Sequence, residues 1–599
     1  MPNLSQIKRQ RMMEFLSKIK EEHKDDDEML IALGEIEAEL NGKKYGLVWE
    51  EHEEAVDIKM QTHIPVFTEV HDKEITTIDG GDYNFLLEGD NLHSLRLLEK
   101  THKGKIDVIY IDPPYNTGSK DFVYDDTFVD KTDLFSHSKW LSFMSKRLSI
   151  AKMLLSNKGS IFISIDDNEE APLKMLCDDI FGEECFVANV AWQRTYSIRN
   201  DSKGIPSEVE HILVYCNNNN WQPKKLERTE KMNSAYKNPD GDRCDWMSGS
   251  PIASDAKTHQ GMVYAIQHPF TGDMIYPNIT AHWRYSQEQM LDYMNGWCKY
   301  ELKELDDAEK RAEICGVSVS DVRKGIKAIV LSKSIEESRK EASAIYKKGP
   351  WPRFYFTNGG KGGIRRKVYA DSVGGRISTN YWMYDEVGHT DEAKKELKAI
   401  FNGSIPFDTP KPTRLIERIL KIATDNDSII LDFFAGSGTT AHAVMKYNSK
   451  NPESNRKFIL CTNNQNQICD EVTYKRILTS IRGYGNVEGI PTNLKYYRTD
   501  FVSKNEEYLS DSLLKHIVEM IQLEHGVKLD GKKYIMLLSD EDVDELEKNW
   551  SDYPDVKALY VSKNILFTTE QNILFKDTEI HIIPDYYFNF ELQEVGESW

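Results

Sequence analysis

The sequence predicts an α/β fold whose doubly wound parallel sheet is interrupted by an inserted domain. Two observations lead to this prediction. Short apolar runs alternate with amphipathic helical segments around residue 110 and again beyond residue 410, which is the pattern of buried parallel strands joined by helices. The stretch 217–376 between these regions is irregular. It is too long for a connecting loop and therefore predicts a separate unit.

The expected elements follow in order along the chain. Residues 4–40 are expected to form two helices, and a short strand leads into Gly89-Asp90-Asn91, where a further helix begins. Buried strands are predicted over 106–112, 159–166, 428–434 and 456–462. The predicted domains are an N-terminal helical and dimerisation region (1–60), the first part of the α/β domain (61–216), the insertion (217–376), the second part (377–500) and an acidic C-terminal α+β domain (501–599).

The net charge of the 599-residue chain is −21, and this charge is concentrated at the two ends. Residues 500–599 hold 22 acidic and 9 basic side chains, and residues 1–60 hold 15 acidic and 9 basic ones. The segment 347–376 instead carries eight basic residues against one acid. The acidic total therefore does not exclude a nucleic-acid partner. The Gly-, Arg- and aromatic-rich segment suits contact with phosphates, although a solvated charged face is the alternative.

Several protein classes are excluded by what the sequence lacks. No apolar run approaches the roughly 18 residues of a membrane span, and the N-terminus has no apolar signal core. The eight cysteines include no C-x-x-C pair, so we expect reduced thiols, a cytoplasmic location and no metal site. The sequence has neither a G-x-x-x-x-G-K-[ST] phosphate loop nor a G-x-G-x-x-G dinucleotide motif.

The first motif that carries chemistry is Asp112-Pro113-Pro114-Tyr115, at the carboxyl end of a predicted buried strand. Doubly wound sheets bind their ligands at such ends. The two prolines fix φ and remove two backbone donors, which leaves carbonyl acceptors, a carboxylate and an aromatic face. This set suits a planar group with an amino group: Asp112 and the Pro113 carbonyl each accept one hydrogen, and Tyr115 stacks on the ring. A loop that only turns a corner is the structural alternative.

The second motif runs from a predicted strand through a glycine turn into a helix, Asp432-Phe433-Phe434-Ala435-Gly436-Ser437-Gly438-Thr439. Glycines let a ligand approach the backbone closely, and the N-terminus of a helix favours an anionic group. Because the nucleotide-phosphate motifs are absent, a nucleoside that carries one carboxylate fits this turn best. The alternative is a turn that serves only tight packing of the helix on the strand.

These residues resemble the β class of DNA amino-methyltransferases, in which a D-P-P-Y motif precedes an F-x-G-x-G motif with the target-recognition domain between them. The sequence is more closely similar to the modification (Mod) subunits of type III restriction–modification systems. The segments that carry the similarity are KKYGLVWEE (43–51), LLEGDNLHSLRLL (86–98), YIDPPYNTGSKDFVYDD (110–126), SIDDNE (164–169), PKPTRLIERIL (410–420), ILDFFAGSGTTAHAV (430–444) and CDEVTYKRI (469–477). The resemblance implies a Rossmann-like methyltransferase sheet with circularly permuted motif order.

The resemblance also implies S-adenosylmethionine as cofactor and N6 of a flipped adenine in duplex DNA as methyl acceptor. It implies catalytic roles for Asp112, Pro113, Pro114 and Tyr115. The cofactor contacts that it implies are Asp90, Asp112, Lys411, Asp432, Phe434, Ala435, Gly436, Ser437, Gly438 and Thr439. The predicted DNA contacts are Asn116, Tyr124, Lys361, Arg365, Arg366 and Lys367. Lys411 is expected to pair with the cofactor carboxylate or to serve in packing, and Gln465 stands where an acid that holds the ribose is expected.

The expected partners are double-stranded DNA, a second copy of the chain and an ATP-dependent restriction (Res) subunit, the last implied by the resemblance alone. The alternatives are a solitary methyltransferase without a nuclease partner, specificity for N4 of cytosine, a catalytically silent nucleic-acid-binding module, and an RNA or protein-amide substrate. Asp rather than Ser at position 112 favours adenine, and the intact motifs count against a silent module.

Overall fold

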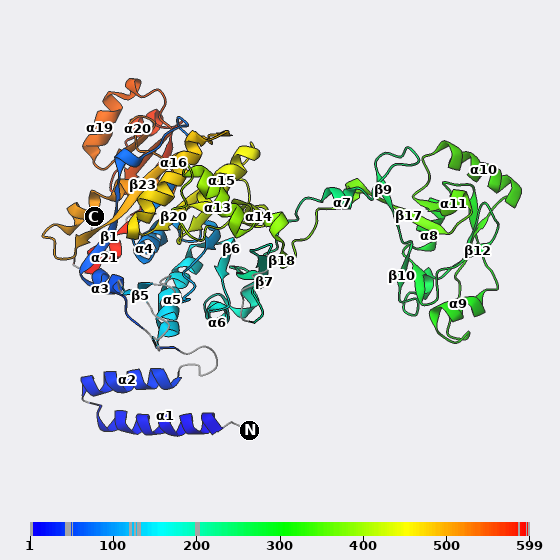
Figure 1. Ribbon diagram of the computed structural model, residues 1–599, viewed down its shortest axis with the longest axis horizontal. Helices are drawn as coiled ribbons and strands as arrows, with labels where there is room; N and C mark the ends of the chain where they lie inside the picture. Colours follow the sequence, from blue (N-terminus) through cyan, green and yellow to red (C-terminus); the bar gives the residue numbers. More distant parts are fainter. Residues whose placement is uncertain are drawn as a thin grey trace. The chain divides into compact units, whose positions relative to one another are not determined.

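The computed structural model describes residues 4–24, 26–41, 49–50, 52–118, 123–124, 127–128, 133, 135–197, 204–584, 587–594 and 596. The chain forms two compact units (Figure 1). Unit 1 is Met1–Lys224 together with Thr379–Trp599, and unit 2 is Lys225–Ser378. Unit 2 is thus inserted into the chain of unit 1, and it overlaps the stretch 217–376 for which the sequence predicts a separate unit.

A ten-stranded sheet forms the centre of unit 1, in the order β1-β23-β2-β20-β19-β3-β6-β8-β7-β18. Its strands are β1 (His63–Glu69), β2 (Tyr83–Glu88), β3 (Ile106–Ile111), β6 (Leu155–Ile165), β7 (Phe186–Gln193), β8 (Val209–Cys216), β18 (Tyr381–Trp382), β19 (Ile429–Asp432), β20 (Lys457–Thr462) and β23 (Asn493–Ser503). The strands from β23 to β6 are parallel, and β8 is antiparallel to its two neighbours. From β3 the chain continues to β6 on one side of this strand pair, and from β19 it continues to β20 on the other side, which makes their junction a topological switch point.

Helices cover both faces of this sheet (Figure 1). One group consists of α4, α5 and α6, and a second of α14, α15 and α16. Their bounds, with those of their neighbours, are α3 (Ala55–Thr62), α4 (Asn91–His102), α5 (Ser136–Leu154), α6 (Glu170–Phe181), α12 (Tyr384–Val387), α13 (Thr390–Ile400), α14 (Thr413–Ala423), α15 (Thr439–Lys450) and α16 (Lys475–Arg482). Within the described part of the chain, no helix has the length and apolar character needed to cross a membrane.

The parallel strands are buried on both faces, which explains their continuous apolar runs. Ile109 and Ile111 of β3 pack with Ile161 of β6 and with Leu95 and Leu98 of α4 in one core. Strands predicted over 106–112, 159–166, 428–434 and 456–462 are confirmed as β3, β6, β19 and β20. Burial on both sides gives such strands no polar face, so they can be recognised from sequence.

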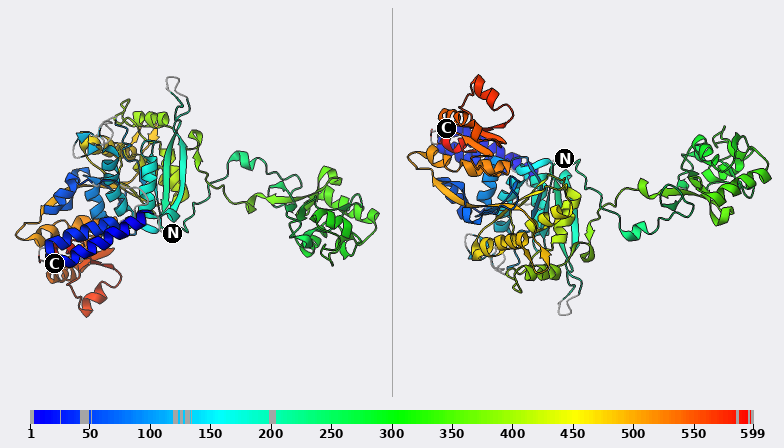
Figure 2. Two further views of the ribbon diagram at one scale, coloured as in Figure 1. Left: turned by 90° about the horizontal axis from the view of Figure 1, so that it is seen from below. Right: turned by 90° about the horizontal axis from the view of Figure 1, so that it is seen from above.

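The N-terminal segment forms the two predicted helices, α1 (Leu4–Glu22) and α2 (Asp27–Asn41). They lie side by side as an antiparallel pair, which Figure 2 shows from two directions. Leu16 and Leu33 are the buried apolar side chains among the described residues of this pair.

The C-terminal residues extend unit 1. Strand β23 crosses the predicted domain boundary at residue 500, and helices α17 (Leu509–Leu514), α18 (Ile517–His525) and α21 (Asn589–Glu594) contribute to the main core. Strands β24 (Tyr534–Leu537), β25 (Ala558–Ser562) and β26 (Glu579–Ile583) form a parallel sheet and alternate with α19 (Asp540–Lys548) and α20 (Thr569–Leu574). The α+β prediction for this part is therefore wrong. The strands are parallel because each helix carries the chain back to start the next strand in the same direction.

Unit 2 has its own aromatic core, which includes Trp246, Tyr264, Trp283, Trp297 and Phe354. Three small sheets surround it, in the orders β12-β11-β15-β14, β16-β17-β9 and β10-β13. Its elements are α7 (Glu230–Asn233), β9 (Trp246–Gly249), β10 (Ile252–Ser254), β11 (Ile266–Gln267), β12 (Met274–Ile275), β13 (Ala281–Trp283), α8 (Gln287–Met294), β14 (Tyr300–Lys303), α9 (Ala308–Cys315), β15 (Ala328–Leu331), α10 (Ile335–Lys348), β16 (Phe354–Phe356), α11 (Thr357–Gly360) and β17 (Ile364–Tyr369).

Candidate active site

The two motifs lie side by side at the carboxyl edge of the large sheet. Strand β3 ends immediately before Asp112, and β19 ends at Asp432. The two strands pair in parallel, with Leu431 opposite Ile109, so both motifs leave the sheet at the same edge. This is the switch point, where doubly wound sheets bind ligands.

An ion pair links Asp112 to Lys411. The Lys411 ammonium donates to both Asp112 carboxylate oxygens, at 2.6 and 2.7 Å, and to the Tyr115 hydroxyl at 2.9 Å. Tyr115 in turn donates to Asp112 at 2.8 Å. Glu210 of β8 lies 3.6 Å from the ammonium, and its other oxygen accepts from Arg194 at 2.7 Å. We call Asp112, Tyr115, Glu210 and Lys411 the Lys411 cluster.

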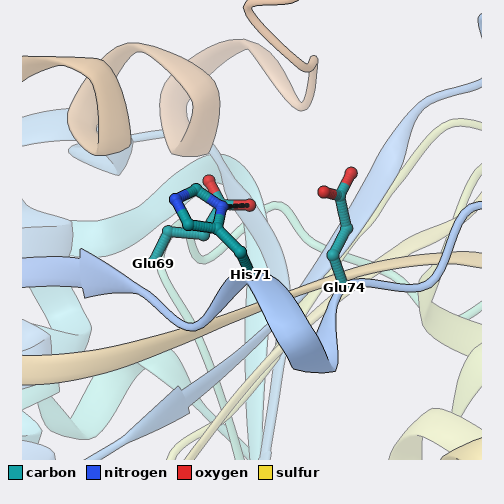
Figure 3. A group of neighbouring side chains, drawn as sticks. All are labelled: Glu69, His71 and Glu74. Carbon is teal, nitrogen blue, oxygen red and sulfur yellow. Dashed lines mark ion pairs between the residues drawn. The ribbon is translucent and has the colours of Figure 1, made fainter.

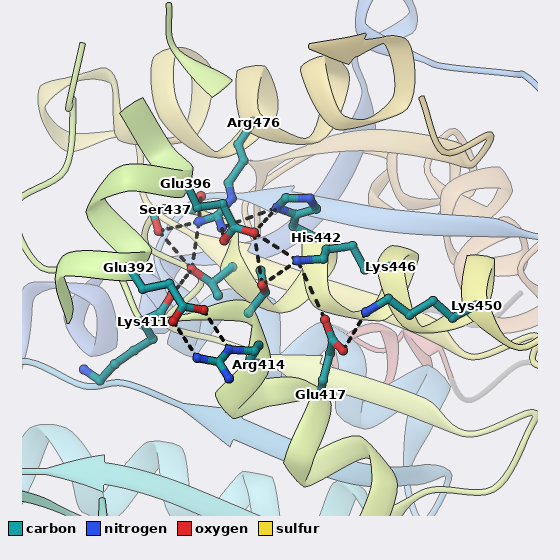
Figure 4. Close-up of polar contacts among 12 residues, drawn as sticks. Glu392, Glu396, Lys411, Arg414, Glu417, Ser437, His442, Lys446, Lys450 and Arg476 are labelled. Atoms are coloured by element: carbon teal, nitrogen blue, oxygen red, sulfur yellow. Dashed lines mark hydrogen bonds and ion pairs between the residues drawn. The ribbon is translucent and has the colours of Figure 1, made fainter. Parts of the chain in front are cut away.

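The Lys411 side chain is only 8% exposed. Burial alone would lower the pKa of Lys411, but the carboxylates of Asp112 and Glu210 raise this pKa above its ordinary value, so the ammonium stays charged. Figure 4 shows the ammonium pointing away from the glycine turn. The backbone carbonyl of Lys411 faces that turn instead, where it accepts from Thr439 at 3.2 Å. The structure therefore pairs Lys411 with Asp112, whereas the sequence suggested either the cofactor carboxylate as its partner or a packing role.

The loop that carries the first motif is held from two sides. The indole of Trp140 donates to the Pro114 carbonyl at 2.7 Å. The amide nitrogen of Asn116, which has a positive φ of 55°, donates to buried Glu169 at 2.6 Å. His137 Nδ1 lies 2.6 Å from the same Glu169 oxygen. Asn116, a predicted DNA contact, thus anchors the loop in this structure.

The buried carboxyl group of Asp432 holds the glycine turn through hydrogen bonds. Asp432 is 3% exposed. It accepts from the Phe434 backbone at 3.0 Å and from the Thr440 hydroxyl at 2.5 Å. Burial raises the pKa of Asp432 to about 7, although these two hydrogen bonds lower it. Phe434 is partly exposed at the turn, whereas Ala435 is buried. The carboxyl group of Asp432 therefore connects the two sides of the turn by hydrogen bonds inside the protein.

Arg476 of α16 holds two predicted cofactor residues, Ser437, which Figure 4 labels, and Thr439. Its guanidinium is fully buried and donates to their hydroxyls at 3.1 and 2.8 Å. Glu396 of α13 pairs with it at 3.1 Å. Burial would raise the pKa of Glu396, but Arg476 and His442 lower this pKa to about 2. An ionised pair thus supports the turn.

A second buried arginine supports the other predicted cofactor turn. Asp90 caps α4 by accepting from the Leu92 backbone at 2.8 Å. Arg147 of α5 is fully buried and donates to Asp90 at 3.2 Å and to Asn91 at 2.5 Å. The Asp90 side chain remains 32% exposed, so it can still meet a ligand at the sheet edge.

An acid does reach the turn that follows β20, although Gln465 occupies the expected position. Asp470 folds back and accepts from the side chain of Asn464 at 2.9 Å. Burial would raise the pKa of Asp470, but its ion pair with Lys73 and the hydrogen bond from Tyr496 lower it to about 2. Asp470 is five residues beyond the expected position in the sequence, so its spacing did not predict this contact. It lies in a π-helical segment, Ile468–Tyr474, which places its side chain at the turn.

One group of described side chains, Glu69, His71 and Glu74, is close enough together to hold a metal ion (Figure 3). Lysines already neutralise its carboxylates, since Glu69 accepts from Lys495 at 2.6 Å and Glu74 from Lys528 at 2.9 Å. These side chains therefore form part of an ion-pair cluster with the two lysines.

The basic residues predicted to contact DNA fall into two classes in unit 2. Lys361 and Arg365 are exposed, and Arg366 is partly buried with Tyr285 as a hydrogen-bond partner at 3.4 Å. These three side chains remain compatible with phosphate contact. The side chain of Tyr124, like the whole of Phe122, lies outside the described residues.

The prediction of a phosphate contact is wrong for Lys367. This side chain is 1% exposed, and its ammonium forms ion pairs with Asp240 and Asp242. It also donates to the Trp351 carbonyl at 2.7 Å. Lys367 thus crosslinks the interior of unit 2.

Sequence reasoning missed several side chains that shape the site: Glu169, Arg194, Glu210, Arg147 and Arg476. Glu169 and Arg476 stand within segments that carried the family resemblance. Glu210 is an acid within an apolar strand run, and a charge in such a run is the signal that could have identified it.

The chain is similar in sequence to known DNA methylases. A family model described as DNA methylase (N6_N4_Mtase) matches residues 106–474. The StyLTI Mod subunit, from a type III restriction-modification enzyme of Salmonella typhimurium, is 34% identical over 72% of this chain and 62% of its own length. The EcoP15I Mod subunit of Escherichia coli is 29% identical over 62% of this chain and 57% of its own length. The chain thus spans about three fifths of these Mod subunits.

Two further proteins extend the comparison. The type II methyltransferase M.KpnI of Klebsiella pneumoniae is 32% identical over 67% of this chain and 86% of its own length. A solved structure, the cytosine-N4-specific PvuII DNA methyltransferase, has a TM-score of 0.32 and 12% identity, and covers 75% of this chain and 97% of its own.

The raised pKa of Asp432 predicts a pH-dependent stability. This carboxyl is protonated in the folded state below about pH 7 but ionises near pH 4 in the unfolded state. The free energy of unfolding that the protonated carboxyl contributes is therefore lost progressively as pH rises from about 4 through about 7. Between pH 5 and 8 the wild type should lose about 2–3 kcal/mol relative to Asp432→Asn, which cannot ionise. Urea unfolding at both pH values measures this difference, and parallel pH profiles would contradict it.

The burial of Lys367 predicts a structural effect of its removal. Lys367→Ala leaves two buried aspartates without a cation and should destabilise unit 2 by about 3–5 kcal/mol. Lys361→Ala, at an exposed position of the same basic segment, should change stability by less than about 0.5 kcal/mol. Hydrogen exchange of peptides from 225–378 in the full chain measures both changes. Equal exchange in the two variants would show that Lys367 is not an internal crosslink.

Proposed function

Because the chain belongs to the DNA methylase family, we propose that it transfers the methyl group of S-adenosylmethionine to N6 of an adenine at a specific site in duplex DNA. The observation that carries this proposal is the place of Asp112. Its carboxylate stands at the switch point, on the strand adjacent to the one that leads into the glycine turn.

The glycine turn suits the amino-acid part of this cofactor. Gly436 and Gly438 have φ values of 50° and 75°, and a Cβ on Gly438 would lie 3.3 Å from the Thr473 side chain. A ligand can therefore approach the backbone directly at the N-terminus of α15, which favours a carboxylate. Phe434 and Asp90 are the partly exposed side chains offered to the rest of the cofactor. When bound, S-adenosylmethionine supplies a methyl group on a positively charged sulfur.

The residues of the first motif would act on the amino group of the base. The nitrogen lone pair of an exocyclic amine is delocalised into the ring, which makes it a weak nucleophile. Hydrogen bonds from its two N–H groups to the Asp112 carboxylate and the Pro113 carbonyl localise this lone pair. Trp140 and Glu169 hold the loop in place, so the acceptors are oriented before the base arrives.

An adenine in duplex DNA must leave the helix to reach Asp112, at a cost of a few kcal/mol. Stacking on Tyr115 would offset about 1–3 kcal/mol of this cost. We assign recognition of the DNA sequence to unit 2, with Lys361, Arg365 and Arg366 as candidates for phosphate contacts. Such contacts set affinity and its salt dependence, whereas base-edge contacts set the target sequence.

We further propose that the chain is the modification subunit of a type III system, acts in the cytoplasm and has an ATP-dependent restriction partner. The printed names of the Mod relatives support this assignment. A solitary methyltransferase is the second candidate, because the match to M.KpnI, whose name is that of a type II methyltransferase, covers 86% of that protein.

The N-terminal helix pair supports the proposal of a homodimer. Phe15 of α1 and Ile31 of α2 are 63% and 65% exposed. Helix α1 carries five basic and three acidic residues, whereas α2 carries five acidic residues and no basic one. A two-fold axis that sets α1 against α2 of a second copy would bury the apolar side chains and match the opposite charges.

Replacing Asp112 tests the methyl transfer. Asp112→Asn removes the negative charge and one acceptor but keeps the shape, so methylation of genomic DNA should fall at least about 100-fold. Cofactor affinity, measured by calorimetry, should change by less than about threefold, since the glycine turn is untouched. Single-molecule sequencing of DNA treated with the wild type should find N6-methyladenine at one short motif.

Each other outcome of that experiment has a distinct meaning. Methylcytosine would overturn the choice of base. A fully active Asp112→Asn variant would overturn the mechanism. Absence of methylation by a wild type that binds the cofactor would contradict the proposed activity of the chain alone.

Introducing charges at the apolar positions of the helix pair tests the dimer. Phe15→Glu combined with Ile31→Glu places like charges on the proposed interface, so light scattering should report a monomer where the wild type gives a dimer. Leu566→Glu alters an even more exposed apolar residue elsewhere, at 87% exposure, and should leave the dimer intact. A monomeric wild type, or a dimer that persists in the double variant, would refute this interface.

A further inference from the structure

One of the two acceptors that the proposed function requires, the Asp112 carboxylate, already accepts hydrogen bonds. Lys411 donates to both oxygens of Asp112 and Tyr115 donates to Oδ1, so an entering adenine amino group meets a carboxylate that already accepts three hydrogen bonds. If the proposed function holds, the lysine ammonium and the amino group of the base therefore compete as donors for the same carboxylate.

The displaced ammonium needs another anionic partner nearby. Its side chain is 8% exposed, and a buried charge without a partner is strongly unfavourable. In the described part of the chain, the second carboxylate that forms an ion pair with Lys411 is Glu210, whose Oε2 lies 3.6 Å from Nζ. The Glu210 side chain is itself 8% exposed, so its charge is equally in need of a partner.

Glu210 is held in place for this exchange. Its Oε1 accepts from Arg194 at 2.7 Å, while its Oε2 lies 3.3 Å from the Tyr115 hydroxyl. Arg194 follows β7, and Glu210 stands on the antiparallel neighbour β8. Because Arg194 holds Oε1, Oε2 is left directed toward Lys411. A small rotation of the lysine side chain can close the distance between Oε2 and Nζ.

We propose that Glu210 is a positioning residue that receives the Lys411 ammonium when the target base enters, and so frees Asp112 to accept from the amino group. This inference rests on the proposed function and names how the site changes between its resting and substrate-bound forms. No covalent bond is made or broken in the exchange, and one donor simply replaces another on Asp112.

The exchange would also select the kind of base. A base that presents an amino group supplies the N–H donors that Asp112 loses when Lys411 moves. A base that presents a carbonyl at the same position leaves two acceptors facing each other, which is a costly arrangement in a buried site. The resting ion pair thus favours amino-bearing bases before any chemistry begins.

A double-mutant cycle tests this proposal. Glu210→Gln keeps the shape of the side chain but not its charge, so Lys411 should remain on Asp112 and single-turnover methylation should fall at least about tenfold. In the Lys411→Met background no ammonium needs a new partner, and adding Glu210→Gln should change the rate by less than about twofold. Glu208→Gln removes a charge two residues earlier and serves as the matched control.

Two further measurements keep the test independent of folding. Cofactor affinity should be the same in the wild type, Glu210→Gln and Glu208→Gln, and Arg194→Gln should reproduce the direction of the Glu210→Gln effect only when Lys411 is present. An unchanged rate in Glu210→Gln, or an equal loss with and without Lys411, would overturn the positioning role while the proposed function stands. If the wild type transfers no methyl group to adenine, the proposed function fails and this inference fails with it.

Discussion

The ion pair between Asp112 and Lys411 is the interaction on which the arrangement of the site depends. Its partners are 299 residues apart in the chain, one before unit 2 and one after it. The Lys411 side chain is 8% exposed, and a charge buried to this extent needs a carboxylate partner. The pair therefore fixes the segment before α14 against the end of β3. Because the Lys411 carbonyl also accepts from Thr439, the same residue places the glycine turn beside Asp112.

Buried arginines make comparable ion pairs and hydrogen bonds at the glycine turn and at the Asp90 turn. Arg476 reaches from α16 to the hydroxyl of Ser437, and Arg147 reaches from α5 to Asp90 and Asn91. Each cation ties a turn to a helix that is distant in sequence. Buried ion pairs add little net stability, but they allow few alternative arrangements. The turns that would meet the cofactor are thus fixed in shape by charge, while the apolar strands beneath them provide the stability.

The sequence predicts the sheet and the motifs well because their signals are local. A parallel strand buried on both faces is a continuous apolar run, and a glycine turn follows it directly in the chain. The partners of charged side chains are not local. Lys367 stands in a basic run, yet its partner Asp242 lies 125 residues earlier, so neither spacing nor composition reveals the pair. The same holds for Lys411, whose ammonium turned out to face Asp112, and for Glu210, which no motif contains.

The distribution of charge and the Lys411 cluster act at successive stages of recognition if DNA is the substrate, as proposed. With a net charge of −21 and Lys367 buried, the overall electrostatic attraction of the chain to phosphates is small, so non-specific binding should be weak. Binding then depends on contacts at a particular sequence. At the sheet edge the ammonium of Lys411 blocks Asp112 until a donor of matching geometry replaces it. The negative charge of the protein disfavours non-specific contacts with phosphates, and the Lys411 ammonium disfavours entry of a base that cannot replace it on Asp112. Both effects increase selectivity by making unproductive contacts unfavourable.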